Sequence, residues 1–224
     1  AVAADSLAGL LRAGMNVARF NMAHGTHASH AASIARLREA SRATGIPVAL
    51  LLDVKGPEIR TGIVEGGGTV ELRAGAEIDV GVDGAPCTAT RISLTYADLP
   101  RQAAPGTRIL IADGTIELDV LSVKGDVTRC LVRTGGSLGS RKNVNIPGIR
   151  SSLPAVTEKD IADIRFGAGQ DMDYVAASFV RKAQDVLDLR QTLIAESASM
   201  HIIAKIEDGE GLANAQEFAQ GTDP

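Results

Sequence analysis

The strongest constraint on the fold is an alternation of expected helices and strands that stops and later resumes. Residues 1–60 follow the pattern helix, strand, helix, strand, and the same rhythm returns after residue 152. The clearest strand, residues 47–53, is a continuous apolar run that ends in a carboxylate. Such runs are typical of parallel strands buried on both faces. The two flanking parts therefore predict an α/β fold.

Local signals mark the ends of the expected helices. Asp5 or Ser6 is expected to cap the first helix, and Gly14 to end it with a left-handed residue. Thr26 is expected to cap the second helix. Residues 157–160 form a capping-box pattern with Asp in place of the usual Glu, which predicts a helix that begins there.

The interruption has the texture of an all-β domain. Short alternating runs are separated by turn signals such as Asp83-Gly84 and Asp113-Gly114, without a helical period. The expected strands are 69–72, 77–82, 91–95, 108–112, 115–123 and 127–132. We therefore divide the chain into a first α/β part (1–60), an inserted β domain (61–152) and a second α/β part (153–224).

Strand–helix alternation is compatible with a doubly wound sheet or with a (β/α) barrel. The expected parallel strands are 15–23, 47–54, 173–180 and 201–208. A closed barrel of this type needs eight strands. The α/β parts are therefore expected to form an open unit with apolar edges.

Composition excludes several function classes. The net charge of −4 offers no basic face for nucleic acid, and no apolar run is long enough to cross a bilayer. The N-terminal residues lack the pattern of a secretory signal. Cys87 and Cys130 have no metal-ligand spacing and are expected to be reduced thiols. These features are typical of a cytoplasmic protein.

Polar side chains follow each expected parallel strand, where barrel enzymes carry their chemistry. They are Arg19, Asn21 and His24; Asp53 and Lys55; Ser178 and Arg181; and Lys205, Glu207 and Asp208. Basic groups in one cleft suit a phosphorylated substrate, and carboxylates beside them suit a divalent cation.

Two of these positions have a specific spacing. Lys205 and Glu207 are two residues apart, so on a strand they share a face, where Lys could stabilise developing negative charge and Glu could bind Mg²⁺. A surface ion pair at a strand end is an equal alternative.

Other signals taken alone favour structural interpretations. His24 could line a nucleotide site or hydrogen-bond within a turn. The glycines of residues 135–139 lie near Arg141 and Lys142, but their spacing fits neither a P-loop nor a dinucleotide fingerprint. A glycine-rich turn followed by a solvated basic pair is expected there.

Six stretches together resemble pyruvate kinase. They are residues 14–25, 52–62, 135–148, 153–160, 177–181 and 203–207. Their order matches the family, and the all-β insert follows the same barrel strand. The resemblance implies a partial (β/α)₈ TIM-type barrel with an inserted, barrel-like β lid domain. It also implies phosphate transfer from phosphoenolpyruvate to ADP, the last step of glycolysis.

The resemblance implies roles for individual residues. The catalytic residues that bind the substrate would be Arg19 and Lys205. The nucleotide would be contacted by Asn21, His24, Arg60 and Lys142. Mg²⁺ or Mn²⁺ would be bound by Glu207, and K⁺ by Asn21, Asp53 and the Val54 carbonyl. The family has Ser where this chain has Ala23, and the hydroxyl of that Ser is a K⁺ ligand that this chain lacks. Glu58, by contrast, follows the pattern of the K⁺-dependent members of the family.

The resemblance also implies that parts of the complete enzyme lie outside these 224 residues. The family's first barrel strand would precede Asp5, and a second Mg²⁺ carboxylate, the last strands and the C-terminal domain would follow Pro224. We therefore expect a chain that is inactive alone and an insert that folds by itself, whereas the complete family forms tetramers. The alternative is a non-catalytic remnant that binds a nucleotide or a partner protein. An aldolase-type lyase is disfavoured by the motif at residues 55–60.

Overall fold

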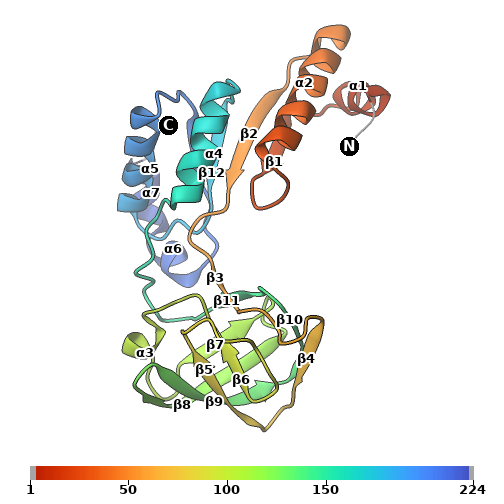
Figure 1. The fold of residues 1–224 in the computed structure, drawn as a ribbon. Helices are drawn as coiled ribbons and strands as arrows, with labels where there is room; N and C mark the ends of the chain where they lie inside the picture. Colours follow the sequence, from red (N-terminus) through yellow and green to blue (C-terminus); the bar gives the residue numbers. More distant parts are fainter. Residues whose placement is uncertain (1–3, 222–224) are drawn as a thin grey trace. The chain divides into compact units, whose positions relative to one another are not determined.

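The computed structural model describes residues 4–221 and divides into two compact units (Figure 1). The first unit comprises residues Ala1–Pro57 and Pro154–Pro224, and the second comprises Glu58–Leu153. No helix within the described residues is long and apolar enough to cross a membrane.

The first unit is built on a parallel sheet of four strands. These are β1 (Val17–Asn21), β2 (Ala49–Val54), β12 (Tyr174–Ala177) and β13 (His201–Ala204). Their order in the sheet is β1-β2-β12-β13, which is also their order along the chain. A doubly wound sheet reverses its strand order, and the described strands show no reversal. The sheet therefore has the topology of a partial (β/α) barrel.

All four expected parallel strands are confirmed, but each is shorter than expected. The register pairs Asn21 with Asp53 and Ala177 with both Val54 and Ala204. The carboxyl ends of the four strands therefore lie along one edge of the sheet.

The helices of the first unit mostly begin where the local signals indicate. They are α1 (Ala4–Arg12), α2 (His27–Thr44), α4 (Glu158–Gly169), α5 (Ala183–Ala195), α6 (Gly209–Ala213) and α7 (Ala215–Gly221). Thr26 and Thr157 cap their helices as expected, and both form reciprocal capping boxes, although a capping box was expected only at Thr157. The expected cap of α1 is wrong, because Asp5 and Ser6 lie inside the helix. Gly14 follows it with a φ of 101°, as expected for a left-handed stop.

The core of the first unit lies between the sheet and its helices. Ile34 of α2, Leu52 of β2 and Ile164 of α4 are completely buried in it. Because these residues come from segments up to 130 positions apart, the arrangement is set by hydrophobic packing and not by local propensity.

The second unit is an all-β domain with one short helix. Its strands are β3 (Ile59–Arg60), β4 (Thr69–Leu72), β5 (Glu77–Gly81), β6 (Arg91–Ser93), β7 (Arg108–Ile111), β8 (Ile116–Lys124), β9 (Val127–Thr134), β10 (Gly136–Gly139) and β11 (Asn143–Asn145), and its helix is α3 (Leu99–Gln102). Seven strands form one sheet in the order β3-β11-β7-β8-β9-β5-β6, and β10 pairs with β4. The six expected strands are confirmed, whereas β3, β10, β11 and α3 were not expected.

The expected turn at the glycines of residues 135–139 is wrong. Gly136–Gly139 is a strand that pairs antiparallel with β4. The physical reason is close backbone approach: a Cβ on Gly135 would lie 2.4 Å from the carbonyl oxygen of Leu72. Glycine here permits two backbones to meet and does not mark a turn.

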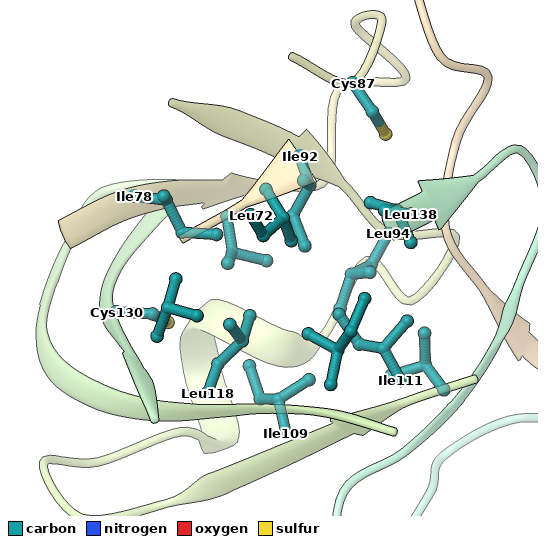
Figure 2. Packing of buried hydrophobic residues seen from close by; sticks show 14 of the residues in the cluster. Leu72, Ile78, Cys87, Ile92, Leu94, Ile109, Ile111, Leu118, Cys130 and Leu138 are labelled. Carbon is teal, nitrogen blue, oxygen red and sulfur yellow. The ribbon is translucent and has the colours of Figure 1, made fainter. Parts of the chain in front are cut away.

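The core of the second unit is continuous and almost entirely apolar (Figure 2). Cys87 and Cys130 are fully buried in it and form no disulfide, which confirms the expectation of reduced thiols. Burial raises the pKa of the Cys130 thiol to about 12, because the charged thiolate would lose its hydration.

Candidate active site at the strand ends

The carboxyl edge of the parallel sheet gathers polar and charged side chains from the ends of four strands. We call Arg19, Asp53, Ser178, Lys205 and Glu207 the strand-end cluster. Arg19 comes from β1 and Asp53 from β2, while Ser178 follows β12 directly and Lys205 follows β13 directly. All five were singled out from the sequence, and the structure brings them into one connected network.

Asp53 is the centre of the strand-end cluster. Its side chain is 3% exposed, and both carboxylate oxygens accept from cations. Arg19 Nε donates to Oδ2 at 2.6 Å, and Lys205 Nζ donates to Oδ1 at 2.9 Å. A buried carboxylate is stable only with such partners. Asp53 therefore fixes two cations side by side at the edge of the sheet.

Lys205 is held from a second side by Ser178. Its Nζ lies 2.6 Å from Ser178 Oγ, and that hydroxyl donates its own proton to the Val54 carbonyl at 2.7 Å. An ammonium has three N–H donors. Two are committed to Asp53 and Ser178, so the orientation of the third is fixed as well.

Glu207 completes the cluster. Its Oε2 accepts the backbone N–H of Phe179 at 2.9 Å, and its Oε1 lies 3.6 Å from Lys205 Nζ. Phe179 has a φ of 56°, a left-handed conformation that is costly for a bulky residue. A backbone donor in such a conformation has no sequence signature, and sequence reasoning missed it.

The alternative of a simple surface ion pair between Lys205 and Glu207 describes only part of the geometry. The pair exists, but the closer partners of Lys205 lie on β2 and after β12. A surface pair would not require a buried carboxylate and a buried hydroxyl from two other strands. The network therefore favours a functional interpretation of these residues.

Two other strand-end charges have structural contacts. Arg181 is 5% exposed and forms an ion pair with Asp185 of α5. Asp208 caps α6 by accepting the N–H of Gly211 at 2.7 Å. Both face helices of the unit, so position at a strand end alone does not identify a site residue.

The loop after β1 carries two more expected site residues. Asn21 Oδ1 accepts the N–H of Ala23 at 2.9 Å. His24 is exposed, and its backbone carbonyl accepts from the ring of His30 at 2.8 Å. The described contacts leave the His24 ring available for a ligand but show no partner that identifies one.

The candidate divalent-cation ligand fits its expected role. The described residues contain no group of three or more His, Cys, Asp or Glu side chains that could enclose a metal. Mg²⁺, however, is commonly held by one or two carboxylates together with substrate oxygens and water. Glu207 is oriented by Phe179 and keeps Oε1 at the edge of the cluster, which suits this mode of binding.

The candidate K⁺ ligands fit less well. Asn21 Oδ1, the Val54 carbonyl and both oxygens of Asp53 each already accept a protein donor. Asn21 Oδ1, the Val54 carbonyl and Asp53 Oδ1 each have a second lone pair, so cation contact is not blocked there, whereas Asp53 Oδ2 is contacted by both Nε and Nη2 of Arg19. Ala23 contributes no side-chain oxygen.

Arg60 and Lys142 belong to the second unit, where they are neighbours. Arg60 of β3 pairs with Asn143 of β11, and Thr61 exchanges hydrogen bonds with Lys142 at 2.8 and 2.9 Å. Arg60 also donates to the Arg141 carbonyl at 2.7 Å and is paired with Glu58. Two basic residues that are 82 positions apart thus lie on neighbouring backbone segments of this unit.

Comparison with known proteins decides the family. The family model described as "Pyruvate kinase, barrel domain" matches residues 1–224. The chain belongs to the pyruvate kinase family. The inserted β unit and the strand-end cluster are therefore parts of a pyruvate kinase fold.

Individual pyruvate kinases match almost the whole chain. The enzyme of Geobacillus stearothermophilus is 46% identical over 223 residues, which are 98% of this chain and 38% of that protein. The enzyme of Dictyostelium discoideum is 45% identical, over 98% of this chain and 44% of that protein. A crystal structure of a pyruvate kinase from Cryptosporidium parvum superposes with a TM-score of 0.92 at 38% identity, covering 98% of this chain and 46% of that one. The chain thus spans less than half the length of these relatives.

Proposed function

We propose that the protein to which this chain belongs transfers the phosphoryl group of phosphoenolpyruvate to ADP, giving pyruvate and ATP. The observation that carries the proposal is the pair of cations, Arg19 and Lys205, fixed on the buried carboxylate of Asp53 in a member of the pyruvate kinase family. Phosphoryl transfer depends mainly on positioning and charge stabilisation, and the cluster supplies both.

Arg19 suits the phosphoryl group. Its side chain is 60% exposed although Nε and Nη2 both contact Asp53. The N–H groups that face away from Asp53 can bind phosphate oxygens in the forked geometry that arginine favours. Because Asp53 holds the guanidinium plane, a phosphoryl group bound to it is held in a defined orientation.

Lys205 suits the enolate that remains when the phosphoryl group departs. Its ammonium is oriented before any substrate binds, by Asp53 and by Ser178. A fixed cation stabilises developing negative charge more effectively than solvent does, because it needs no reorganisation. We propose Lys205 and Arg19 as the catalytic residues.

The ions follow from the same geometry. We propose that Glu207 binds Mg²⁺ or Mn²⁺ through the oxygen that Phe179 does not occupy. When bound, the divalent ion supplies Lewis-acid stabilisation of the transferring group. K⁺ is proposed on Asn21, Asp53 and the Val54 carbonyl, with weaker activation than in relatives that have serine at the position of Ala23.

The nucleotide and assembly proposals rest on the family. Asn21 and His24 in the first unit, with Arg60 and Lys142 in the second, are proposed to contact ADP or ATP. We further propose a homo-oligomer located in the cytoplasm. A relative from Glycine max that is 43% identical is named a cytosolic isozyme, which supports that location.

Binding of phosphoenolpyruvate to the chain tests the proposal directly. In the presence of Mg²⁺ we expect phosphoenolpyruvate to bind with a millimolar or lower dissociation constant. The binding is measured by titration, with ³¹P NMR of the ligand and NMR of the protein. Arg19→Met and Lys205→Met should each weaken it about tenfold or more, because each removes a charged hydrogen-bond donor. Lys182→Met, at the exposed N-cap position just before α5, is the matched control and should bind like the unaltered chain. Equal binding by all four proteins, or none by the folded chain, would contradict the assignment.

A further inference from the structure

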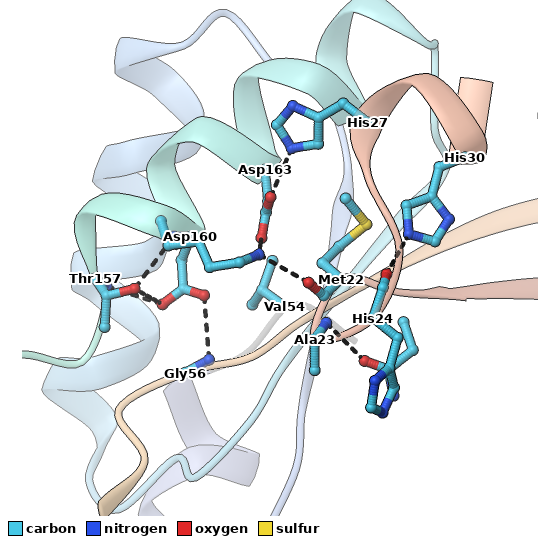
Figure 3. A network of polar contacts seen from close by, with 12 residues as sticks. Met22, Ala23, His24, His27, His30, Val54, Gly56, Thr157, Asp160 and Asp163 are labelled. Carbon is cyan, nitrogen blue, oxygen red and sulfur yellow. Dashed lines mark hydrogen bonds and ion pairs between the residues drawn. The ribbon is translucent and has the colours of Figure 1, made fainter. Parts of the chain in front are cut away.

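A charged contact from helix α4 reaches the loop that carries Asn21. Lys159 Nζ donates to the backbone carbonyl of Met22 at 2.8 Å (Figure 3). Lys159 lies on α4 and is 137 residues further along the chain than Met22. It follows no parallel strand, so its contact with a site loop could not be inferred from strand-end position.

The peptide bond between Met22 and Ala23 links this contact to Asn21. Its carbonyl oxygen accepts from Lys159, and its N–H, on Ala23, donates to Asn21 Oδ1 at 2.9 Å. A peptide group is a rigid plane, so fixing the oxygen fixes the direction of the N–H. The orientation of the Asn21 amide is therefore coupled to the Lys159 ammonium through one plane.

The preceding peptide group is held independently. The N–H of Met22 donates to the Asp53 carbonyl at 2.9 Å, which extends the pairing of β1 with β2 by one residue. The Met22 side chain is 4% exposed in the core. The Met22 N–H thus provides a reference in the same loop that does not depend on Lys159.

Lys159 is itself held in place. Its Nζ lies 2.6 Å from Oδ2 of Asp163, one turn later on α4, and Asp163 is 2% exposed. The other oxygen of Asp163 lies 2.7 Å from His27 Nε2, and the His27 ring stacks on Phe166 with centroids 4.6 Å apart. Since residues 159, 163 and 166 share one face of α4, the helix presents a fixed ammonium to the loop.

We propose that Lys159 is a positioning residue, which sets the side-chain orientation of Asn21 through the Met22–Ala23 peptide plane. Asn21 is a proposed ligand of the nucleotide and of K⁺, so the consequence for binding rests on the proposed function. The orientation itself does not, and it can be measured without substrate, metal or activity.

NMR of the labelled chain tests this inference. In Lys159→Met we expect the Asn21 side-chain amide and the Ala23 backbone signals to shift. Hydrogen exchange of the Ala23 N–H should accelerate at least tenfold relative to that of the Met22 N–H. Lys159→Arg, which keeps a cationic donor, should restore most of the Asn21 and Ala23 signals. Lys182→Met, the exposed control, should leave them unchanged.

Two results would overturn the inference. Unchanged Asn21 and Ala23 signals in Lys159→Met would show that Lys159 does not orient Asn21. Equal acceleration of exchange at Met22, at Ala23 and in the core would show a purely structural role through general stability. Both measurements are made without phosphoenolpyruvate, so failure of the inference is distinguishable from failure of the proposed function.

Discussion

The ammonium of Lys205 lies 2.9 Å from the buried carboxylate of Asp53, although 152 residues separate the two in sequence. The contact passes over the end of β12, which lies between β2 and β13 in the sheet, and the all-β insert lies between the two residues along the chain. Arg19 occupies the other oxygen of the same carboxylate. Asp53 therefore makes the two proposed catalytic cations interdependent.

This interdependence predicts a non-additive effect on stability. Lys205→Met or Arg19→Met alone leaves Asp53 with one cation and should cost about 1 kcal/mol of unfolding free energy or less. The double variant leaves a buried carboxylate with neither cation and should cost about 3–5 kcal/mol. Urea unfolding of the four proteins in a double-mutant cycle measures the coupling. Additive losses would show that Asp53 does not depend on the pair.

Gly56, at the exit of β2, is predicted to be irreplaceable for a steric reason. Its φ is 68°, and a Cβ there would lie 2.6 Å from the Ser178 carbonyl oxygen. Gly45 has nearly the same φ, 69°, with open space around it. Gly45→Ala should lower the free energy of unfolding by about 1–2 kcal/mol, through backbone strain alone. Gly56→Ala should cost about 1–3 kcal/mol more, through the clash. Thermal unfolding compares the two, and equal losses would refute the steric account.

The second unit is predicted to fold without the first. Its core draws only on residues between Ile59 and Leu153, and it is nearly free of polar groups. Residues 58–153 expressed alone should give dispersed NMR signals and a cooperative unfolding transition. A disordered product would show that the unit depends on the α/β part and would contradict the expected domain division.

The thiol of Cys130 is predicted to be inert in the folded protein. The reactive species is the thiolate, and burial raises the pKa of this thiol to about 12, so almost none is ionised at neutral pH. Iodoacetamide at pH 8 should leave Cys130 unmodified until denaturant is added, as peptide mass spectrometry would show. Modification at the same rate with and without denaturant would contradict the buried placement.

Short-range sequence signals predicted the first unit well. Parallel strands buried on both faces give continuous apolar runs, and the helix cap at Thr26 and the capping box at Thr157 depend on only a few neighbouring residues. Strand ends were less predictable. The expected strand at residues 173–180 ends at Ala177, because Phe179 turns into a left-handed conformation that no local pattern marks.

Long-range pairing explains what was missed in the second unit. β3 has two residues and pairs with β11, whereas β11 has three residues and pairs with both β3 and β7. Such short strands carry no periodic signal. β10 was hidden by its glycines and by Gly135 just before it, where a Cβ would lie 2.4 Å from the Leu72 carbonyl oxygen of β4.

The charged residues of the candidate site could be predicted from the sequence, but the hydrogen bonds that connect and orient them could not. Arg19, Asp53, Lys205 and Glu207 follow from their positions at strand ends. The bridge that Ser178 makes between Lys205 and Val54, and the contact of Lys159 with Met22, depend on three-dimensional proximity between distant segments. These contacts determine orientation, which sequence position does not encode.

The most direct test of the proposed function is catalysis by a chimera. Residues 1–224 replace the matching stretch of the Geobacillus stearothermophilus pyruvate kinase, to which the chain is 46% identical. The assay follows pyruvate formation from phosphoenolpyruvate and ADP with Mg²⁺. We predict turnover within about tenfold of the parent enzyme, and a loss of at least about 100-fold in Lys205→Met but not in Lys182→Met. A folded chimera without activity, or one that is indifferent to Lys205, would contradict the assignment of the strand-end cluster as the catalytic site.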